Sequence, residues 1–324
     1  MKKMVFVTDK SFPSYDEFIS AVEGAGHEIV FASGKEEDTL IREGAGADIV
    51  VNSFALVTAK FINSLTKCTM ILRTGVGVNT IDVEAATAKK IRVCYVPDYC
   101  QDEVADQTIA LTLCAARKIC FLDKRVRAGS WDSVEAGYVP RLSGCTFGLL
   151  GFGGIAKRVA KRIMAFDMKV IAYDPFLSDE EFSSAGVARA KTCDEVFSAS
   201  DIISLNLPLN AETKYIINSE NIGKMKDGVF IVNTARGPLI KEDDLVKALK
   251  TGKVCAAGLD VFEEEPLPAK SELRDLDNVI ITPHSAYYST LSLPELRARS
   301  LDEVMRVLEG RPSRIVYNKS ALGL

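Results

Sequence analysis

The chain has 324 residues, a length that predicts two domains rather than one. Its 40 basic and 44 acidic residues leave a net charge of −4 with no basic block, which argues against a protein that binds nucleic acid through charge. No apolar run is long enough to span a membrane, and the N-terminal stretch is too short for a signal peptide. We therefore expect a cytoplasmic protein without a membrane partner.

The cysteine pattern predicts neither a zinc site nor a disulfide framework. The eight cysteines contain no CxxC pair, and only two histidines are available to help bind a metal ion. We therefore expect reduced thiols and no metal. The cysteines are Cys68, Cys94, Cys100, Cys114, Cys120, Cys145, Cys193 and Cys255.

Residues 4–96 alternate short apolar runs with helical patterns. Strands are expected at residues 4–7, 28–31, 49–51, 70–72 and 93–96, and helices at about 15–23, 36–43, 59–65 and 82–89. This alternation predicts a doubly wound parallel sheet in one compact domain. Backbone amides at Gly75 and Gly77, just before a helix, would suit a carboxylate, although a plain glycine-rich turn explains the pattern equally well.

A second α/β unit is expected from residue 146, after a long helix over about residues 101–128. Its strands are expected at 146–150, 169–173, 187–190, 202–205, 229–233, 255–259 and 279–281, and a final helix at about 294–309 precedes an extended segment at 315–318. A cofactor motif occurs only in this second unit. We therefore expect a cofactor domain at residues 101–286, inserted into a substrate-binding domain formed by residues 1–100 and 287–324.

The strand predicted at 146–150 runs into Gly151-x-Gly153-x-x-Ala156 and then into a helix, the context of a dinucleotide-binding turn. Gly151 permits the tight turn, Gly153 lets the backbone approach a pyrophosphate, and the small Ala156 keeps helix and strand close. Asp174 follows the next strand, where an acid would bind the adenosine ribose and repel a 2′-phosphate. The predicted cofactor is NAD rather than NADP; the alternative is an ordinary βαβ unit with a glycine turn.

Three late strands are followed by an arginine, an acid and a histidine, namely Arg236, Glu265 and His284. Because ligands bind at the carboxyl ends of strands in open α/β sheets, we expect these side chains to share one site. Histidine transfers protons near neutral pH, a neighbouring carboxylate stabilises its charged form, and arginine binds a carboxylate through two hydrogen bonds. The set suits hydride transfer at a carbonyl, although each residue alone could be a surface or capping residue.

At these residues the chain resembles the D-isomer-specific 2-hydroxyacid dehydrogenase family, and the resemblance covers nearly the whole sequence. Besides the dinucleotide turn, the matching segments include Gly75-Val76-Gly77-Val78, Glu103-Val104-Ala105-Asp106, Tyr173-Asp174-Pro175, Asn233-Thr234-Ala235-Arg236-Gly237, Gly258-Leu259-Asp260-Val261-Phe262 and Thr282-Pro283-His284. The resemblance implies an α/β fold of two doubly wound parallel-sheet domains, a flavodoxin-like substrate domain and a Rossmann NAD-binding domain.

By that resemblance the catalytic residues are Arg236, Glu265 and His284. Arg236 would bind the substrate carboxylate and carbonyl, His284 would donate or accept the proton, and Glu265 would tune His284. Substrate contacts are implied at Ser53, Val76, Gly77, Arg236 and Tyr287. Cofactor contacts are implied at Thr108, Gly151, Phe152, Gly153, Gly154, Ile155, Asp174, Leu207, Pro208, Thr213, Thr234, Ala235, Arg236, Asp260, His284 and Ala286.

The implied activity is reversible hydride transfer between NADH and a small 2-oxo acid of the glyoxylate, hydroxypyruvate or pyruvate type, catalysed by a homodimer. Residues 99–106 and 284–289 most resemble the branch with the C-terminal-binding-protein corepressors, so an NAD(H)-sensing interaction protein is an alternative. A D-3-phosphoglycerate dehydrogenase is another. The arginine typical of phosphoglycerate-acting members is absent at Asn52-Ser53-Phe54, where only Arg73 lies nearby.

Overall fold

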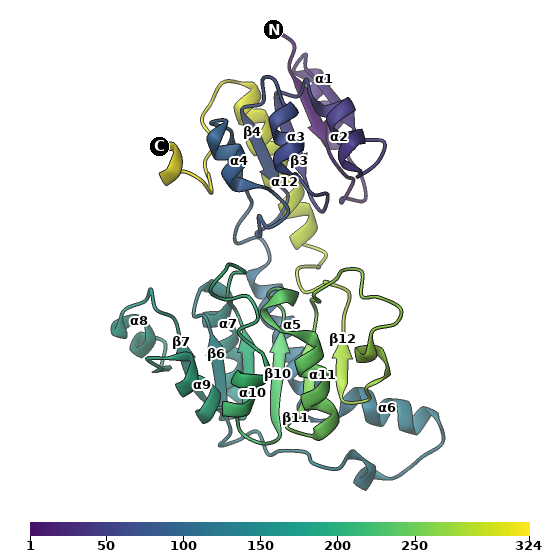
Figure 1. Ribbon diagram of the computed structural model, residues 1–324, viewed down its shortest axis with the longest axis vertical. Helices are drawn as coiled ribbons and strands as arrows, with labels where there is room; N and C mark the ends of the chain where they lie inside the picture. Colours follow the sequence, from purple (N-terminus) through teal and green to yellow (C-terminus); the bar gives the residue numbers. More distant parts are fainter. The chain divides into compact units, whose positions relative to one another are not determined.

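The computed structural model describes residues 1–324 and divides into two compact units (Figure 1). Unit 1 comprises residues 1–99 and 289–324, and unit 2 comprises residues 100–288. These bounds lie one or two residues from the expected ones. Along the chain, unit 2 is therefore inserted into unit 1.

Unit 1 contains a five-stranded parallel sheet in the order β2-β1-β3-β4-β5, which confirms the expected doubly wound arrangement. All four residues of its strand at residues 49–52 are buried, and so are three of the four residues in each of the strands at residues 4–7 and 70–73, as expected for strands covered by helices on both faces. The elements of unit 1 are β1 (Met4–Val7), β2 (Glu28–Phe31), β3 (Ile49–Asn52), β4 (Met70–Arg73), β5 (Arg92–Cys94), α1 (Asp16–Gly24), α2 (Glu37–Gly44), α3 (Ala59–Ser64), α4 (Val83–Ala88) and α12 (Ser292–Leu308).

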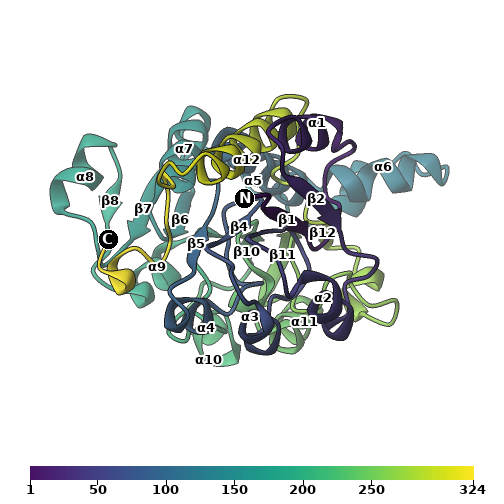
Figure 2. The same ribbon diagram turned by 90° about the horizontal axis from the view of Figure 1, so that it is seen from above.

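The C-terminal segment completes unit 1. Helix α12 lies beside α1 (Figure 2), and Lys3 Nζ donates a hydrogen bond of 3.1 Å to the carbonyl of Val307 near the end of α12. Farther along the chain, Tyr317 N donates to Val93 O at 2.7 Å, and Val93 N donates to Asn318 Oδ1 at 2.9 Å. The C-terminal segment therefore contacts unit 1 near the start of β1, through α12, and at the β5 edge of the sheet, through Tyr317 and Asn318.

Unit 2 contains a seven-stranded parallel sheet in the order β12-β11-β10-β9-β6-β7-β8. The strand order reverses between β6 and β9, which is the topological switch point of a Rossmann fold. Its elements are α5 (Gln101–Ala116), α6 (Ile119–Arg127), β6 (Thr146–Leu150), α7 (Gly154–Ile163), β7 (Lys169–Tyr173), α8 (Asp179–Ser184), β8 (Ala188–Arg189), α9 (Cys193–Ala199), β9 (Ile202–Leu205), α10 (Ser219–Lys224), β10 (Val229–Asn233), α11 (Glu242–Thr251), β11 (Val254–Leu259) and β12 (Val279–Ile281).

Apolar side chains fill both faces of the unit 2 sheet. Helices α5, α7 and α8 bury residues such as Ala105, Val159 and Phe182 against one face. Helices α9, α10 and α11 bury residues such as Phe197 and Leu245 against the other (Figure 2). No helix in the structure combines the length and apolar character that crossing a bilayer requires.

The long helix expected over residues 101–128 is wrong, because two helices occupy this stretch. Helix α5 ends at Ala116, and Lys118 adopts a left-handed backbone with φ 55° before α6 begins. The left-handed backbone of Lys118 interrupts the helical hydrogen bonds. The sequence has no glycine or proline at this point from which the end of the helix could be predicted. The strand expected at 187–190 is also shorter, with only Ala188 and Arg189 paired.

Several helices begin at residues whose side chains cap the first turn. Thr58 accepts a hydrogen bond from Phe61 N, and Asp82 accepts one from Ala85 N. In α8, Ser178 and Glu181 cap one another reciprocally. Such caps stabilise a helix by about 1 kcal/mol each and fix where the chain leaves each strand-end loop.

Candidate active site

The carboxyl end of β10 carries Arg236 into position through a turn organised by Asn233. The Asn233 side chain is fully buried, and its Oδ1 accepts a hydrogen bond from Ala235 N at 3.0 Å. Its Nδ2 donates to Arg236 O at 2.8 Å. The Arg236 guanidinium in turn donates to Ala235 O at 2.6 Å. The backbone around Arg236 is therefore fixed from inside the sheet.

Gly237 joins this turn to the loop that follows β11. A Cβ at residue 237 would overlap the carbonyl of Phe262 and the amide of Glu263. Only glycine permits this approach, so the matching Asn233-Thr234-Ala235-Arg236-Gly237 motif has a packing reason for its last residue. The loop after β11 supplies Glu265, which thus lies on a segment packed against the arginine turn.

Glu265 and His284 are in direct contact. His284 Nδ1 and Glu265 Oε2 lie 2.7 Å apart, and the second carboxylate oxygen accepts a hydrogen bond of 3.0 Å from Phe262 N. Burial by itself would raise the pKa of Glu265, but the hydrogen bond and charge of His284, the Phe262 amide and the Arg236 charge together lower it. Glu265 therefore stays a carboxylate beside the imidazole, with about a third of each side chain exposed to solvent.

The backbone of His284 has φ 51°, in the left-handed region that a non-glycine residue rarely adopts. Asp260 holds this conformation from a fully buried position at the end of β11. Its carboxylate accepts hydrogen bonds from Thr282 Oγ1, from Ser285 N at 3.0 Å and from Ala286 N at 2.9 Å. The carbonyl of Asp260 also accepts from His284 N at 2.8 Å.

Tyr287 lies next to the histidine loop. Its ring centroid is 6.4 Å from that of His284, with the planes inclined by 74° in an edge-on arrangement. The ring thus limits where the imidazole can turn, while the adjacent Glu265 contact fixes its Nδ1.

The turn between β6 and α7 has the shape that a dinucleotide requires. Gly151 has φ 87°, and a Cβ there would lie 2.6 Å from Asn206 O, so the position demands glycine. A Cβ at Gly153, by contrast, would meet no atom within 4 Å. The backbone at Gly153 therefore faces open space at the start of the ten-residue helix α7, whose first turn contains Gly154 and Ile155.

Asp174 lies at the end of β7 beside this turn. Its Oδ2 accepts a hydrogen bond from Phe152 N and its Oδ1 one from Phe176 N, both at 3.0 Å. The Phe152 ring is fully buried and stacks on Phe182 at 5.0 Å. Phe152 can therefore contribute to cofactor binding only through its backbone.

The other predicted cofactor residues lie at strand ends of the same sheet or on α5. Thr108 and Thr234 are buried, and their hydroxyls lie 2.8 Å apart. Thr213 Oγ1 donates to Pro208 O at 2.6 Å, which closes the loop that follows β9. The remaining positions, Leu207, Ala235 and Ala286, follow β9, β10 and β12 respectively.

In unit 1, the predicted substrate contacts follow β3 and β4. The Ser53 side chain is almost fully buried, and its hydroxyl lies 2.6 Å from both Ser11 Oγ and Thr74 Oγ1. The Ser53 hydroxyl is thus directed at side chains of unit 1 and not at solvent. Val76 is exposed and Gly77 is half-buried, so the backbone in this turn is accessible.

Sequence reasoning missed Asp9, which organises the same end of unit 1. This buried carboxylate accepts hydrogen bonds from Ser53 N at 3.1 Å, Phe54 N at 2.8 Å and Ala55 N at 3.3 Å. The available signal was its place just after the first strand, at the same sheet edge as residues 52–54.

A family model for the NAD-binding domain of D-isomer-specific 2-hydroxyacid dehydrogenases matches residues 109–286. The chain belongs to that family. The predicted family is thereby confirmed, and so is NAD as its cofactor.

Two 2-hydroxyacid dehydrogenase relatives show how far the likeness extends. The chain is 43% identical over 252 residues to a hydroxypyruvate reductase of Thermotoga maritima, covering 77% of this chain and 81% of the relative. It is 39% identical over 315 residues to a D-3-phosphoglycerate dehydrogenase of Methanocaldococcus jannaschii, covering 97% of this chain. The matched part is only 59% of that relative, so the chain spans less than two thirds of its length.

A solved structure in the family shares both units. The crystal structure of a glyoxylate reductase from Paecilomyes thermophila matches with a TM-score of 0.88 at 29% identity, covering 98% of this chain and 99% of the other. This likeness confirms the predicted fold of two parallel-sheet domains.

Proposed function

We propose that this protein transfers hydride reversibly between NADH and a small 2-oxo acid of the glyoxylate, hydroxypyruvate or pyruvate type. The observation that carries the proposal is the 2.7 Å contact between His284 Nδ1 and Glu265 Oε2, on loops that follow β12 and β11. Arg236 follows the neighbouring strand β10. The names of the relatives, a hydroxypyruvate reductase and a glyoxylate reductase, support the same chemistry.

The Glu265 contact supports proton transfer through one particular nitrogen of His284. Because Nδ1 is bound to the carboxylate, Nε2 is the nitrogen that donates a proton to the carbonyl oxygen during reduction and accepts it during oxidation. The Glu265 carboxylate, kept charged by its lowered pKa, stabilises the protonated imidazole. Bound NADH supplies the hydride.

Arg236 binds the carboxylate of the substrate and polarises the adjacent carbonyl. A guanidinium presents its donors in a planar fork that matches a carboxylate, which orients the 2-oxo acid as well as holding it. The rigid turn around Asn233 reduces the freedom that Arg236 would otherwise lose on binding. The other proposed substrate contacts are the backbone amides of Val76 and Gly77 and the side chain of Ser53 in unit 1, and the Tyr287 ring beside His284 in unit 2.

The glycine turn at Gly151 and Gly153 holds the pyrophosphate of NAD, and Asp174 accepts hydrogen bonds from the adenosine ribose. Support comes from the open space above Gly153 and from the position of Asp174 beside the turn. Asp260 and the Thr108–Thr234 pair lie on the nicotinamide side. A negative charge at Asp174 disfavours the 2′-phosphate of NADP.

Steady-state assays of NADH oxidation with glyoxylate, hydroxypyruvate, pyruvate and longer 2-oxo acids test the proposal. We expect turnover with at least one short acid and weaker activity with NADPH. Tight NADH binding without turnover of any acid would instead support the NAD(H)-sensing interaction protein. Loss of both binding and turnover would refute both functions.

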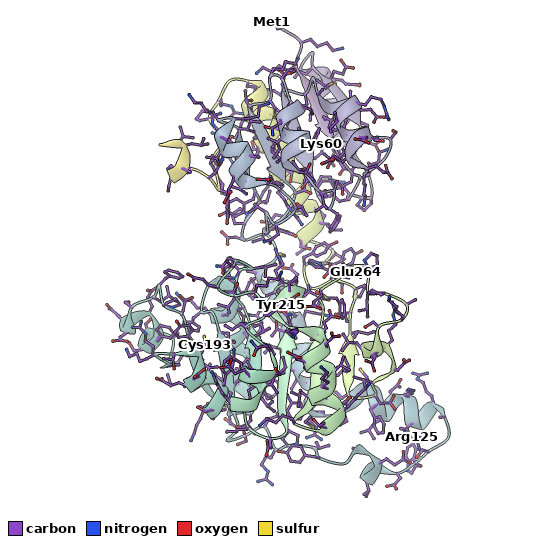
Figure 3. The ribbon with its side chains drawn as sticks, viewed as in Figure 1. Met1, Lys60, Arg125, Cys193, Tyr215 and Glu264 are labelled. Carbon is purple, nitrogen blue, oxygen red and sulfur yellow. The ribbon has the colours of Figure 1, made fainter.

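We further propose that the active protein is a homodimer formed through residues 119–138. This segment contains α6 and a short 3₁₀ helix at Ser133–Ala136, and it extends from unit 2 at Arg125 (Figure 3). Trp131 is 90% exposed and Val134 81% exposed, an apolar surface suited to a second copy of the chain. An ion pair between Arg125 and Glu135 keeps the segment in one shape.

Light scattering of the purified protein measures this state directly. We expect a dimer for the wild type and a monomer for Trp131→Asp, because a buried charge would oppose the contact. Phe176→Asp is the control, because Phe176 is exposed but follows β7 and lies outside residues 119–138, and this variant should leave the mass unchanged. A wild-type monomer at assay concentration would contradict the homodimer.

We also propose a cytoplasmic location. Support comes from the eight cysteines, none of which forms a disulfide bond in the structure, as in a reducing compartment. Cell fractionation with a specific antibody would test it, and recovery outside the cytoplasmic fraction would contradict it.

A further inference from the structure

The buried carboxylate of Asp260 connects the residues on both sides of His284. Thr282 Oγ1 donates a hydrogen bond to Asp260 Oδ1, two residues before the histidine. After the histidine, Ser285 N donates to Asp260 Oδ1 at 3.0 Å and Ala286 N donates to Oδ2 at 2.9 Å. Because Asp260 is fully buried, its carboxylate depends on these donors in place of water. The loop that carries His284 is therefore closed around one buried carboxylate.

Helix α5 adds a donor from outside this loop. Gln107 Nε2 donates a hydrogen bond of 3.2 Å to Thr282 Oγ1. A threonine hydroxyl has a single hydrogen to donate, and in Thr282 that hydrogen is directed to Asp260 while the oxygen accepts from Gln107. The amide, the hydroxyl and the carboxylate thus form a hydrogen-bond chain with one direction, in which each group orients the next.

This hydrogen-bond chain supports a backbone conformation that is unfavourable on its own. His284 has φ 51°, a value that costs energy for a residue with a side chain. Its amide donates to Asp260 O at 2.8 Å and to Thr282 O at 3.0 Å. The direction in which the imidazole leaves the backbone depends on this conformation, and so does the contact of His284 Nδ1 with Glu265.

We propose that Thr282 and Gln107 are positioning residues for the proton transfer at His284. This inference rests on the proposed function and deepens it, because it adds two groups that act on the reaction through other residues. Neither side chain titrates, so each acts by holding the Asp260 carboxylate and, through it, the left-handed backbone of His284. A small displacement of the imidazole would place its Nε2 poorly against the carbonyl oxygen and slow the proton transfer.

Substitutions at residue 282 separate the effect of the hydroxyl from that of the side-chain shape. Thr282→Val keeps the shape but removes the donor to Asp260 and the acceptor for Gln107. We expect kcat for 2-oxo acid reduction to fall by about tenfold to hundredfold, and the dissociation constant of NADH to change by less than about twofold. Thr282→Ser keeps the hydroxyl and should recover most of the lost kcat. Gln107→Met should cause a smaller loss of kcat, because Thr282 still donates to Asp260.

Thr251→Val is the matched control, because the Thr251 hydroxyl also donates a hydrogen bond in unit 2, to Ala248 O at 3.2 Å within α11. This variant should leave kcat unchanged. An equal loss of kcat in Thr282→Val and Thr282→Ser would overturn the proposal, since the hydroxyl would then have no effect of its own. Weakened NADH binding in Thr282→Val with an unchanged kcat would overturn it as well.

A measurement without turnover separates this inference from the proposed activity. The chain has only two histidines, His27 in unit 1 and His284 in unit 2, so nuclear magnetic resonance of protein with labelled histidine records two imidazoles. In Thr282→Val and in Gln107→Met, the ring signals of His284 should shift while those of His27 remain in place. Gln107→Met alone decides the question if the valine variant does not fold.

The two failures have different signatures. A wild-type protein that turns over no 2-oxo acid, with His284 signals that still shift in the variants, would refute the proposed function alone. Unshifted His284 signals in the folded variants would overturn the positioning role, whether or not the wild type is active.

Discussion

Gly237 lies against Phe262 so closely that no side chain larger than hydrogen fits between the loop of Arg236 and the loop of Glu265. The spacing of two candidate catalytic groups therefore depends on a residue that carries no chemistry of its own. The close contact between Gly237 and Phe262 also explains why a change at residue 237 should affect activity and stability together.

Gly237→Ala should lower the melting temperature and reduce kcat by at least about tenfold, because the β11 loop must move away to admit the methyl group. Gly223→Ala is the control. A Cβ at Gly223 meets no atom within 4 Å, and alanine favours helix α10 by about 0.5–1 kcal/mol. Thermal melts and steady-state kinetics measure both variants. If Gly237→Ala and Gly223→Ala had the same melting temperature and the same kcat, the packing argument would be contradicted.

His284→Ala should reduce kcat for 2-oxo acid reduction by about 10²–10⁴-fold, since the variant lacks the group that we propose as the proton donor. The affinity for NADH should remain nearly unchanged, because the glycine turn and Asp174 lie elsewhere in unit 2. Fluorescence titration with NADH and stopped-flow turnover separate the two effects. Lost NADH binding with intact chemistry would remove His284 from the proposed role.

Glu265→Gln should change how the reduction rate depends on pH. As the pH is raised, the rate of the variant should begin to fall at a lower pH than the rate of the wild type. The pKa of Glu265 is lowered in the folded protein, so its carboxylate remains charged below its ordinary range and stabilises the protonated imidazole. Glutamine keeps a hydrogen bond but removes this charge, so the variant stabilises the protonated imidazole less. The alkaline limb of the kcat/KM profile should move down by about one pH unit. An unmoved limb would mean that Glu265 acts through position alone.

Asp174→Ala should relax the preference for NAD over NADP. The variant loses the two amide contacts at Phe152 and Phe176 and the negative charge that we propose disfavours a 2′-phosphate. The measurement is the ratio of kcat/KM for the two reduced cofactors, with the exposed Asp179→Ala as control for a lost surface charge. A ratio equal to that of the wild type would exclude Asp174 from cofactor selection.

Thiol labelling at about pH 8 should modify Cys120 much faster than the buried cysteines. Burial raises the pKa of Cys68 to about 12 and those of Cys94 and Cys193 to about 11, so these groups contain almost no thiolate at that pH. Mass spectrometry after short exposure identifies the modified residue. All eight should react in denaturant, and rapid labelling of Cys68 in the native protein would contradict the described core.

The parts of the site that the sequence predicts are those that depend on parallel strands ending at one edge. Arg236, Glu265 and His284 follow three neighbouring strands, and the direct contact of the last two agrees with that expectation of proximity. The roles of these residues stay proposals until the variants are measured. Asp174 likewise follows the strand next to the glycine turn.

Other features depend on tertiary contacts that local sequence patterns do not predict. The helix break at Lys118 occurs without glycine or proline, and the amide cluster around Asp9 joins segments more than forty residues apart in sequence. The three donors that Asp260 binds could not be read from its motif, and neither could the buried orientation of Ser53. Each depends on tertiary packing rather than on residue type.

The insertion of unit 2 into unit 1 has a consequence for synthesis on the ribosome. Unit 2 is one continuous stretch, so residues 100–288 can fold as soon as they emerge. The β5 edge of unit 1 must wait for Tyr317 and Asn318, whose hydrogen bonds to Val93 complete it. During translation, the first 99 residues therefore remain an unfinished domain with an exposed strand edge, and this is the interval in which a chaperone would be of most use.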